Sequence, residues 1–139
     1  MERTVILVKP DGVQRGLIGQ IMARFEKAGF KMIAAKLVWL NDELLNQWYA
    51  HHLDKPFFPA LAAFMKETPV MAMVWQGEDV ISQVRGMSGA TDPAKAEKGT
   101  IRADLGTEIQ RNVVHISDSP ESAAKEIKLM FSPEEILEY

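Results

Sequence analysis

The chain has 139 residues, enough for one domain with a buried core, and its 47% apolar and 25% charged residues are ordinary for a soluble globular protein. A net charge of −3 disfavours a general nucleic-acid binder, and the lack of cysteine excludes disulfides, thiolate metal sites and thiol nucleophiles. The first apolar run, residues 5–8, is too short for a signal peptide or membrane span, so we expect a cytoplasmic protein without a membrane partner. No repeat or linker interrupts the chain, and residues 1–139 are expected to form a single domain.

The beginning of the chain predicts one strand followed by one helix. Residues 4–8 are apolar and rich in β-branched side chains, which indicates a buried strand, and Lys9-Pro10-Asp11-Gly12 indicates a turn after it. Apolar residues then recur at helical spacing over 13–25, and Gly29 is typical of a helix stop.

The middle of the chain predicts a second strand and two short helices. Residues 31–40 have a strand-like pattern, and Asn41 or Asp42 is suited to cap the helix that follows. The segment 56–59 carries a proline at each end and marks a break. Apolar side chains over 61–65 then predict the second short helix.

The last part of the chain predicts two further strands, two helices and a long loop. Residues 70–75 form an apolar strand, and 77–79 open a helix that extends to Met87. Residues 88–106 have no clear period and contain three glycines and a proline, which is typical of a shaped loop. Residues 112–116 indicate the last strand, and a final helix follows with its apolar face over residues 123–131.

This order of elements, β-α-β-(αα)-β-α-β-α, predicts an α/β (α+β) domain with a sheet covered by helices on one side. A ferredoxin-like βαββαβ sandwich with a four-stranded antiparallel sheet fits if the second and third strands pair across the two short helices. The competing flavodoxin-like parallel sheet needs more strands than the pattern contains.

His115 ends the last apolar run, directly before residues suited to begin a helix. Ser119 can cap that helix with Pro120 at its first position, and a helix N-terminus favours anions. A neutral imidazole is a good nucleophile, so His115 is the candidate for covalent chemistry on a phosphate. Glu126, two turns into the helix, could orient the ring directly or through Ser117, or could simply lie on a solvated helix face.

Three cations, Lys9, Arg85 and Arg102, stand beside glycines or turns rather than on long amphipathic faces. Each alone is compatible with a solvated charge, but together they could converge on phosphates, where charge-assisted hydrogen bonds contribute roughly 1.5–3 kcal/mol each. The glycines at 12, 16 and 19 do not have the spacing of a phosphate-binding loop, and we reject that motif.

Two pairs of neighbouring ring side chains precede the second short helix. We expect a surface role for His51 and His52, because adjacent histidines on a helix point in different directions and would not share a metal with Asp54. Phe57 and Phe58 indicate either core residues or an exposed platform for a nucleotide base, and their composition alone favours the core.

Taken together, these segments resemble the nucleoside diphosphate kinase family along nearly the whole chain. The signature of that family is Asn-x-x-His, then Gly or Ala, then Ser-Asp; here Asn112-Val113-Val114-His115 and Ser117-Asp118 fit, whereas Ile116 does not. The similar segments are ERTVILVKPDGVQRGLIGQI, KPFFPALAAFM, PVMAMVWQGEDVI, GATDPAKAEKGTIRADLG and RNVVHISDSPESAAKEI.

The resemblance implies a phosphotransferase that moves the terminal phosphate of ATP or another nucleoside triphosphate to a nucleoside diphosphate by a ping-pong mechanism. His115 would become a phosphohistidine, and Mg²⁺ would be carried by the nucleotide phosphates rather than by protein ligands. Phe57 would stack on the base, with Ile109 on its other side. The family pattern implies binding of phosphates and ribose by Lys9, Arg85, Thr91, Arg102 and Asn112, and support of the histidine by Tyr49, Ser117 and Glu126.

The resemblance also implies a homo-oligomer, a hexamer or a tetramer built from a common dimer, with residues 88–106 near a subunit boundary. One alternative function, a catalytically impaired nucleotide-binding or interaction module on the same fold, depends on Ile116. Another, a ferredoxin-like binder of nucleic acid, is disfavoured by the charge. We expect an active enzyme with extended backbone at Ile116, because Val113 and Val114 before it also favour a strand.

Overall fold

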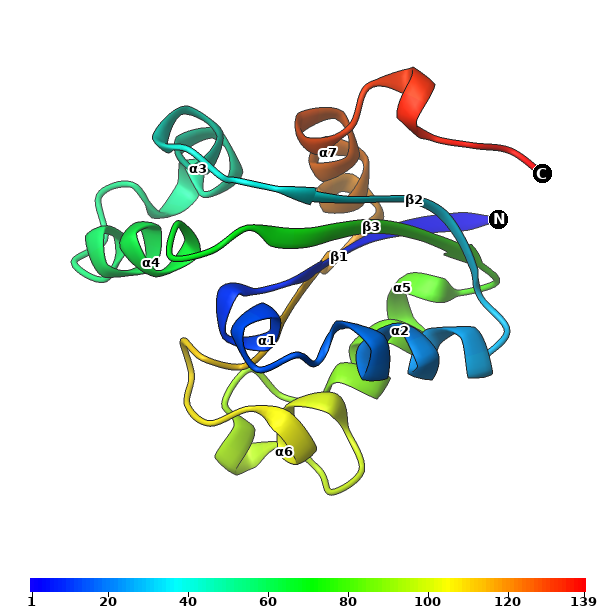
Figure 1. The fold of residues 1–139 in the computed structure, drawn as a ribbon, viewed down its shortest axis with the longest axis horizontal. Helices are drawn as coiled ribbons and strands as arrows, with labels where there is room; N and C mark the ends of the chain where they lie inside the picture. The colour runs from blue at the N-terminus through cyan, green and yellow to red at the C-terminus, as the bar shows by residue number, and fades with distance from the viewer.

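The computed structural model describes residues 1–139, and four strands alternate with seven helices along it (Figure 1). Short 3₁₀ turns lie at Ala50–His52, Pro93–Lys95 and Pro133–Glu135. The strands and helices are β1 (Glu2–Val8), α1 (Pro10–Gln14), α2 (Ile18–Lys27), β2 (Lys31–Val38), α3 (Asp42–Trp48), α4 (Phe58–Met65), β3 (Val70–Gly77), α5 (Val80–Ser88), α6 (Ile101–Leu105), β4 (Val114–Ile116) and α7 (Pro120–Met130).

The four strands form one antiparallel sheet in the order β2-β3-β1-β4. The β2 and β3 strands pair across the two short helices between them, which confirms the ferredoxin-like arrangement and excludes a parallel flavodoxin-like sheet. The β1 strand lies in the centre, and its register places Leu7 opposite His115. The last strand is therefore aligned along the strand that ends at Lys9.

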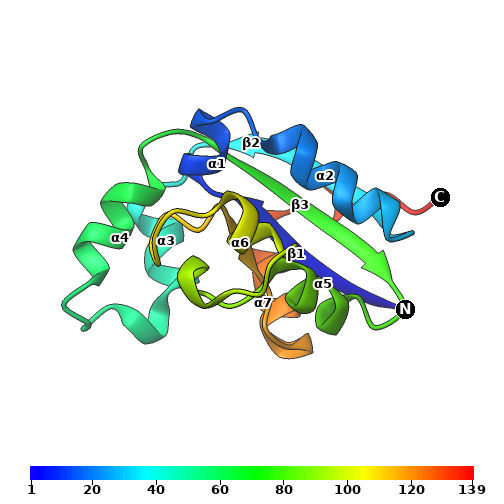
Figure 2. The ribbon, with the colours of Figure 1, turned by 90° about the horizontal axis from the view of Figure 1, so that it is seen from below.

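Helices cover both faces of the sheet, so the prediction of a single covered face was wrong. Side chains alternate along β1: Val5 and Leu7 belong to one apolar cluster, which α3, α4 and α7 complete, while Ile6 and Val8 belong to another with α2 and α5. Figure 2 shows α2 and α5 lying across the second face. The continuous apolar run of β1 is the pattern expected of a strand that is buried on both sides.

The polar stretch after β1 is a short helix, not the turn that we predicted. Lys9 has extended backbone at the N-cap and Pro10 occupies the first turn, where the fixed φ of proline suits a helix and its missing N–H costs nothing. The helix expected over residues 13–25 is consequently two helices, α1 and α2, separated near Gly16 at φ 70°. The stop at Gly29 is confirmed, with φ 89°.

Both predicted N-caps are made by side chains. The Asn41 side chain accepts a hydrogen bond from the Leu44 N–H at 2.8 Å, and Ser119 accepts one from the Ser122 N–H at 3.1 Å, with Pro120 at the first position of α7. The region 88–106 is only partly a loop, because it contains α6, whose single turn and a half is too short to produce a clear apolar period.

The last strand begins two residues later than predicted. Val113 has φ 65°, a left-handed conformation that costs a β-branched residue roughly 1–3 kcal/mol, although its intrinsic preference is extended.

None of the helices combines the length and the apolar character needed to cross a bilayer. The cytoplasmic location that we expect stays a prediction.

Candidate active site

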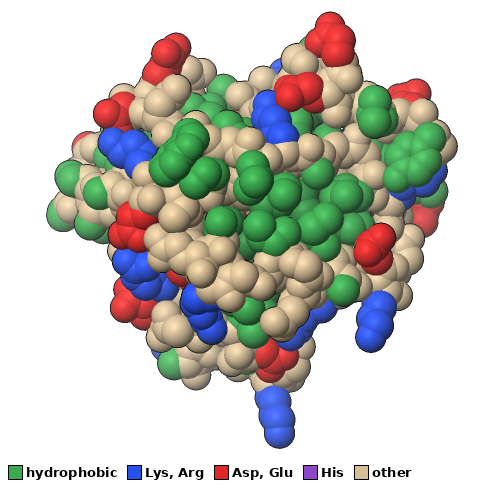
Figure 3. Space-filling view, viewed as in Figure 1, with side chains coloured by type: hydrophobic (Ala, Val, Ile, Leu, Met, Phe, Trp, Pro, Cys, Tyr) green, Lys and Arg blue, Asp and Glu red, His purple; other side chains and the backbone are tan.

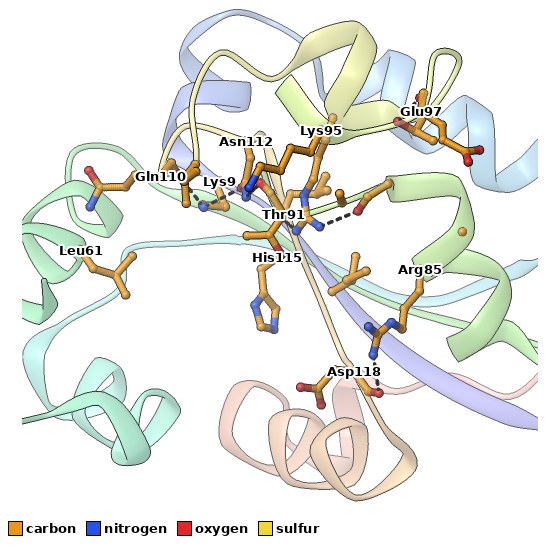
Figure 4. A pocket seen from close by; sticks show the side chains of 18 of the residues that line it. Lys9, Leu61, Arg85, Thr91, Lys95, Glu97, Gln110, Asn112, His115 and Asp118 are labelled. Carbon is orange, nitrogen blue, oxygen red and sulfur yellow. Dashed lines mark hydrogen bonds between the residues drawn. The ribbon is translucent and has the colours of Figure 1, made fainter. Parts of the chain in front are cut away.

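A cleft of about 1050 Å³ opens at the end of β1, between the α4 region on one side and α5 and α6 on the other (Figure 4). It brings together side chains from six separate segments of the chain. Two predicted residues, Ser117 and Glu126, lie behind the histidine rather than on the wall. The predicted residues that line the cleft are Lys9, Tyr49, Phe57, Arg85, Thr91, Arg102, Ile109, Asn112 and His115.

The His115 ring is held from behind and faces the cleft from β4. Its Nε2 lies 3.0 Å from Glu126 Oε2, and the other carboxylate oxygen accepts a hydrogen bond from Ser117 Oγ at 2.7 Å. Ser117 Oγ in turn accepts the Val5 N–H at 3.0 Å. Because a carboxylate only accepts, Nε2 carries the proton, and Nδ1 keeps a lone pair for an incoming group. The ring is 20% exposed, which leaves it accessible.

Arg102 is a buried cation whose guanidinium lies next to the histidine strand. It donates to the carbonyl oxygens of Val114 at 2.8 Å and Gly89 at 3.1 Å, and thereby joins α6 to β4 and to the end of α5. Burial, followed by the charge of Arg85, lowers the pKa of Arg102 to about 10. It therefore remains charged at neutral pH.

Lys9 brings a second buried cation to the cleft from the end of β1. Its Nζ donates to Gln110 O at 2.8 Å and to Asn112 Oδ1 at 2.9 Å, so one of its three N–H groups remains for a ligand. Burial lowers the pKa of Lys9 to about 8, although the carboxylate of Asp11 opposes this change and Arg102 adds to it. Lys9 is thus cationic just below that pH and neutral above it.

We expect the kcat/KM for a nucleoside triphosphate to fall as the pH rises through about 8. The reason is that kcat/KM reports groups of the free enzyme, and neutral Lys9 loses a charge-assisted bond, a loss of roughly 10- to 100-fold. Steady-state kinetics from about pH 6.5 to 9.5 will measure it. Lys9→Met should be slower at low pH and lack this decline; the same decline in that variant would contradict the assignment to Lys9.

The polar rim of the cleft is made by Arg85, Thr91 and Asn112. Arg85 is exposed on α5 and donates to Asp118 O at 3.0 Å, which joins it to the start of α7. Asn112 Nδ2 donates to Thr91 O at 2.9 Å and so fixes the long loop against the histidine segment. Hydrogen bonding to Ser122, with the charge of Arg85 contributing, lowers the pKa of Asp118.

The other end of the cleft is aromatic and apolar. Phe57 is 51% exposed and Ile109 60% exposed, and both line the cleft, so the composition-based preference for a core Phe57 was wrong. Phe58, in contrast, packs against the core. The surface role expected for both histidines holds only for His51, because His52 lines the cleft with its ring between those of Tyr49 and Phe57. Burial, to which Glu126 adds, raises the pKa of Tyr49.

Sequence reasoning missed several residues of the cleft wall. Lys95 and Gln110 line it from the long loop and from the segment before β4, and Lys95 extends over the opening in Figure 4. Asp118 lines the rim, although the sequence indicated no role for it beyond its place in the family signature. No local pattern distinguishes Lys95 or Gln110 from solvated loop residues, because their position depends on how the loop folds back.

Comparison with known proteins identifies the family. The family model described as nucleoside diphosphate kinase matches residues 2–136. The chain belongs to the nucleoside diphosphate kinase family. It is 56% identical to the nucleoside diphosphate kinase of Carboxydothermus hydrogenoformans over 139 residues, covering 100% of this chain and 93% of that one. To the nucleoside diphosphate kinase of Saccharomyces cerevisiae it is 54% identical over 138 residues, covering 99% and 90%.

A solved structure agrees with this membership. The halophilic nucleoside diphosphate kinase of Halobacterium salinarum, in complex with CDP, matches with a TM-score of 0.97 and 46% identity, covering 99% of this chain and 92% of that one. The protein is therefore a phosphotransferase that moves the terminal phosphate of a nucleoside triphosphate to a nucleoside diphosphate.

Ile116, the departure from the signature of this kinase family, has ordinary extended backbone. It lies in β4 opposite Ile6, outside the left-handed region, and its side chain packs against the apolar cluster on that face of the sheet. It also lines the cleft. The backbone strain that would have favoured an impaired module is thus located at Val113 and not at Ile116.

We expect Ile116→Ala to change kcat/KM by less than about tenfold, or ~1.4 kcal/mol, because the isoleucine already fits an extended, packed position. The measurement is steady-state kinetics with ATP and a nucleoside diphosphate at matched concentrations. A gain of ~10³ or more would mean instead that Ile116 obstructs the natural site, and the impaired-module alternative would then be preferred.

Proposed function

We propose that His115 is the phosphate carrier of this nucleoside diphosphate kinase. The observation that carries the proposal is the fixed ring: Glu126 accepts a hydrogen bond from the Nε2–H at 3.0 Å, which leaves the lone pair of Nδ1 for an incoming group. Histidine can form a covalent intermediate, and two buried cations, Lys9 and Arg102, line the same cleft.

The two half-reactions use the same groups in opposite directions. In the first, Nδ1 of His115 attacks the terminal phosphorus of a nucleoside triphosphate; a P–N bond forms, the terminal P–O bond breaks, and the diphosphate leaves with the bonding electrons. The ring gains positive charge while it keeps its Nε2 proton, and Glu126 stabilises that charge. In the second, a terminal oxygen of another diphosphate attacks the phosphorus, the P–N bond breaks, and the neutral imidazole returns.

The cations of the cleft stabilise the moving phosphoryl group. Phosphoryl transfer requires little besides alignment and charge neutralisation, and we propose these roles for Lys9, Arg85 and Arg102. Thr91 and Asn112 would position the phosphates and ribose. The two are joined by the hydrogen bond of 2.9 Å from Asn112 Nδ2 to the Thr91 carbonyl oxygen. Tyr49 and Ser117 would support the ring–carboxylate pair, because Ser117 donates to Glu126 and Tyr49 lines the cleft within electrostatic range of the same carboxylate.

We propose that Mg²⁺ enters on the nucleotide. The donor set fits this, because the carboxylates on the cleft wall are Glu97, which lies at the far rim, and Asp118, at the rim beside Arg85 (Figure 4). Mg²⁺ prefers phosphate oxygens and water with at most one or two carboxylates. When bound, it would neutralise charge on the phosphate oxygens, and Asp118 is the cleft carboxylate that would help to hold it there.

The proposed substrates are ATP and the other common nucleoside di- and triphosphates. Phe57 and Ile109 are exposed and apolar and would hold the base between their surfaces, which contact its faces rather than its edge. Stacking does not depend strongly on which base is bound, because every base has a π-face. A site of this kind binds purines and pyrimidines alike.

Weak selectivity between bases is therefore expected. The kcat/KM values for ADP, GDP, CDP and UDP as acceptors should lie within roughly 100-fold of one another, a span under ~3 kcal/mol. Competition kinetics with a single donor will measure them, and Phe57→Ala should reduce all four together. A preference beyond ~10⁴ would show that a base edge is being read by hydrogen bonds.

Incubation with Mg²⁺ and ATP labelled on the terminal phosphate tests the carrier directly. The expected product is a protein label that is stable in alkali, labile in acid and removed by any nucleoside diphosphate. Peptide mapping should place it on His115. A label on His51 or His52, or transfer without any protein label, would refute the proposed intermediate.

We also propose that residues 1–139 form one domain and that the protein is a homo-oligomer. β2 is an edge strand of the sheet. It carries Leu37, whose side chain is 60% exposed, and Trp39, just beyond its end, is 62% exposed. Figure 3, in the orientation of Figure 1, shows hydrophobic side chains gathered between the β2 and α2 elements. Native proteins usually cover such an edge, and a second copy of the chain would do so. A hexamer and a tetramer both remain compatible with this proposal.

A further inference from the structure

Directly before His115 the backbone makes a tight turn with unfavourable geometry. The Val114 N–H donates to the carbonyl oxygen of Asn112 at 2.9 Å, so the turn closes over one residue, Val113. That residue has φ 65°, which is rare and strained for a β-branched side chain in a three-residue turn. Such conformations persist only where the surroundings impose them, and they gather at functional sites.

Asp11 is the side chain that imposes this turn. Its Oδ2 accepts the Val113 N–H at 3.1 Å, and the main-chain N–H of Lys9 donates to the Val113 carbonyl oxygen at 2.9 Å. Both main-chain groups of the strained residue are therefore held from the junction between β1 and α1. The Val113 side chain is fully buried in the core, so the side chain is held in place as well as the two main-chain groups.

Asp11 is itself a buried carboxylate that the proposed transfer does not use. It is 4% exposed, and its other oxygen, Oδ1, is buried without a hydrogen-bond partner. A buried, half-satisfied carboxylate is costly to maintain, so a purely structural position would be better filled by a neutral group. The only hydrogen bond of its side chain is the one that it accepts from the Val113 N–H.

We propose that Asp11 is a positioning residue for phosphoryl transfer, and that it holds the turn at Val113 so that Asn112 and His115 both point into the cleft. Successive residues of an extended strand point to opposite faces, so an extended Val113 would change the direction of Asn112 relative to His115. Asn112 Oδ1 accepts from Lys9 Nζ at 2.9 Å, and that pairing depends on the same turn. The inference rests on the proposed role of His115.

The test compares Asp11→Ala with Asp11→Asn, because asparagine keeps an oxygen that can accept the Val113 N–H. The first-order rate of His115 labelling is measured in single turnovers at saturating ATP and at about pH 6.5, below the pKa of Lys9, because both variants remove the Asp11 charge that raises that pKa. Asp11→Ala should slow labelling by roughly 10- to 100-fold, since small displacements of reacting groups have effects of that size. Asp11→Asn should recover most of it. Asp42→Ala, at an exposed aspartate of α3 outside the cleft, is the matched control.

Val113→Gly supplies a second, independent measurement. Glycine adopts positive φ without being held, so the loss caused by Asp11→Ala should shrink to about threefold or less in that background. Three results would overturn the inference: wild-type labelling in Asp11→Ala, equal losses in the alanine and asparagine variants, or an undiminished loss in the Val113→Gly background. If Val113→Gly fails to fold, the alanine–asparagine comparison decides alone. A wild-type protein that takes no label on His115 would instead refute the carrier proposal itself.

Discussion

Replacement of His115 by alanine is expected to abolish the phosphoprotein and to lower turnover by more than ~10³-fold, because the covalent route disappears. The cleft would keep Lys9, Arg102 and Phe57, so nucleotide binding should survive the change. Turnover is measured with a coupled assay, and binding by the quenching or exchange of a fluorescent diphosphate. Retained binding with lost turnover is the pattern of a group that is needed for the chemical step and not for ground-state binding.

The matched control is His51→Ala, because His51 is exposed and lies outside the cleft wall. It should label and turn over like the wild type. Glu126→Gln is an intermediate case, since the amide oxygen can still accept a hydrogen bond from the Nε2–H but carries no charge to stabilise the phosphorylated ring. Full activity in His115→Ala would show that phosphate passes directly between nucleotides.

Replacement of Arg102 by alanine should lower kcat/KM by roughly 10²- to 10³-fold, the usual effect of removing one donor aimed at developing charge. Two losses combine. The phosphate loses a buried cation, and the carbonyl oxygens of Gly89 and Val114 lose the guanidinium that holds the long loop against the histidine strand. Steady-state kinetics and thermal unfolding, measured together, separate the two effects.

Arg102→Lys distinguishes charge from geometry, because lysine keeps the charge but cannot donate to both carbonyls as a fork. It should recover only part of the activity. Arg24→Ala is the control: Arg24 also contacts this segment, through Asp104 at 2.9 Å and Gly99 O at 3.2 Å, but from outside the cleft. If both arginine-to-alanine variants lose equal activity, the loss reflects loop stability rather than phosphate binding.

Elements that depend on local signals could be predicted from the sequence. The Ser119 cap with Pro120 predicted the start of α7. Of the two routes expected from Glu126 to the ring, the direct one is made, while Ser117 bonds to the other carboxylate oxygen and not to the ring. Strand pairing across α3 and α4 also followed from the order of elements. These features need only chain neighbours and one helix period.

The parts that could not be predicted are set by distant contacts. Valine favours extended backbone, but at position 113 two groups about a hundred positions earlier in the chain, those of Asp11 and Lys9, hold it in a left-handed turn. Exposure of Phe57 depends on which of two adjacent rings turns inward, and no local pattern decides that. The partners of Arg102 are backbone carbonyls, which carry no side-chain signature.

The use of a single phosphate carrier in a single cleft has a consequence for metabolism as well as for chemistry. Donor and acceptor occupy the same space, so they must visit in turn, and an unphosphorylated enzyme that holds a diphosphate is idle until that molecule leaves. The anhydride bond broken in one visit and the one made in the next are chemically alike, and the net driving force is close to zero. The direction of flux is then set by the relative sizes of the nucleotide pools, and the protein acts as an equaliser between them rather than as a one-way valve.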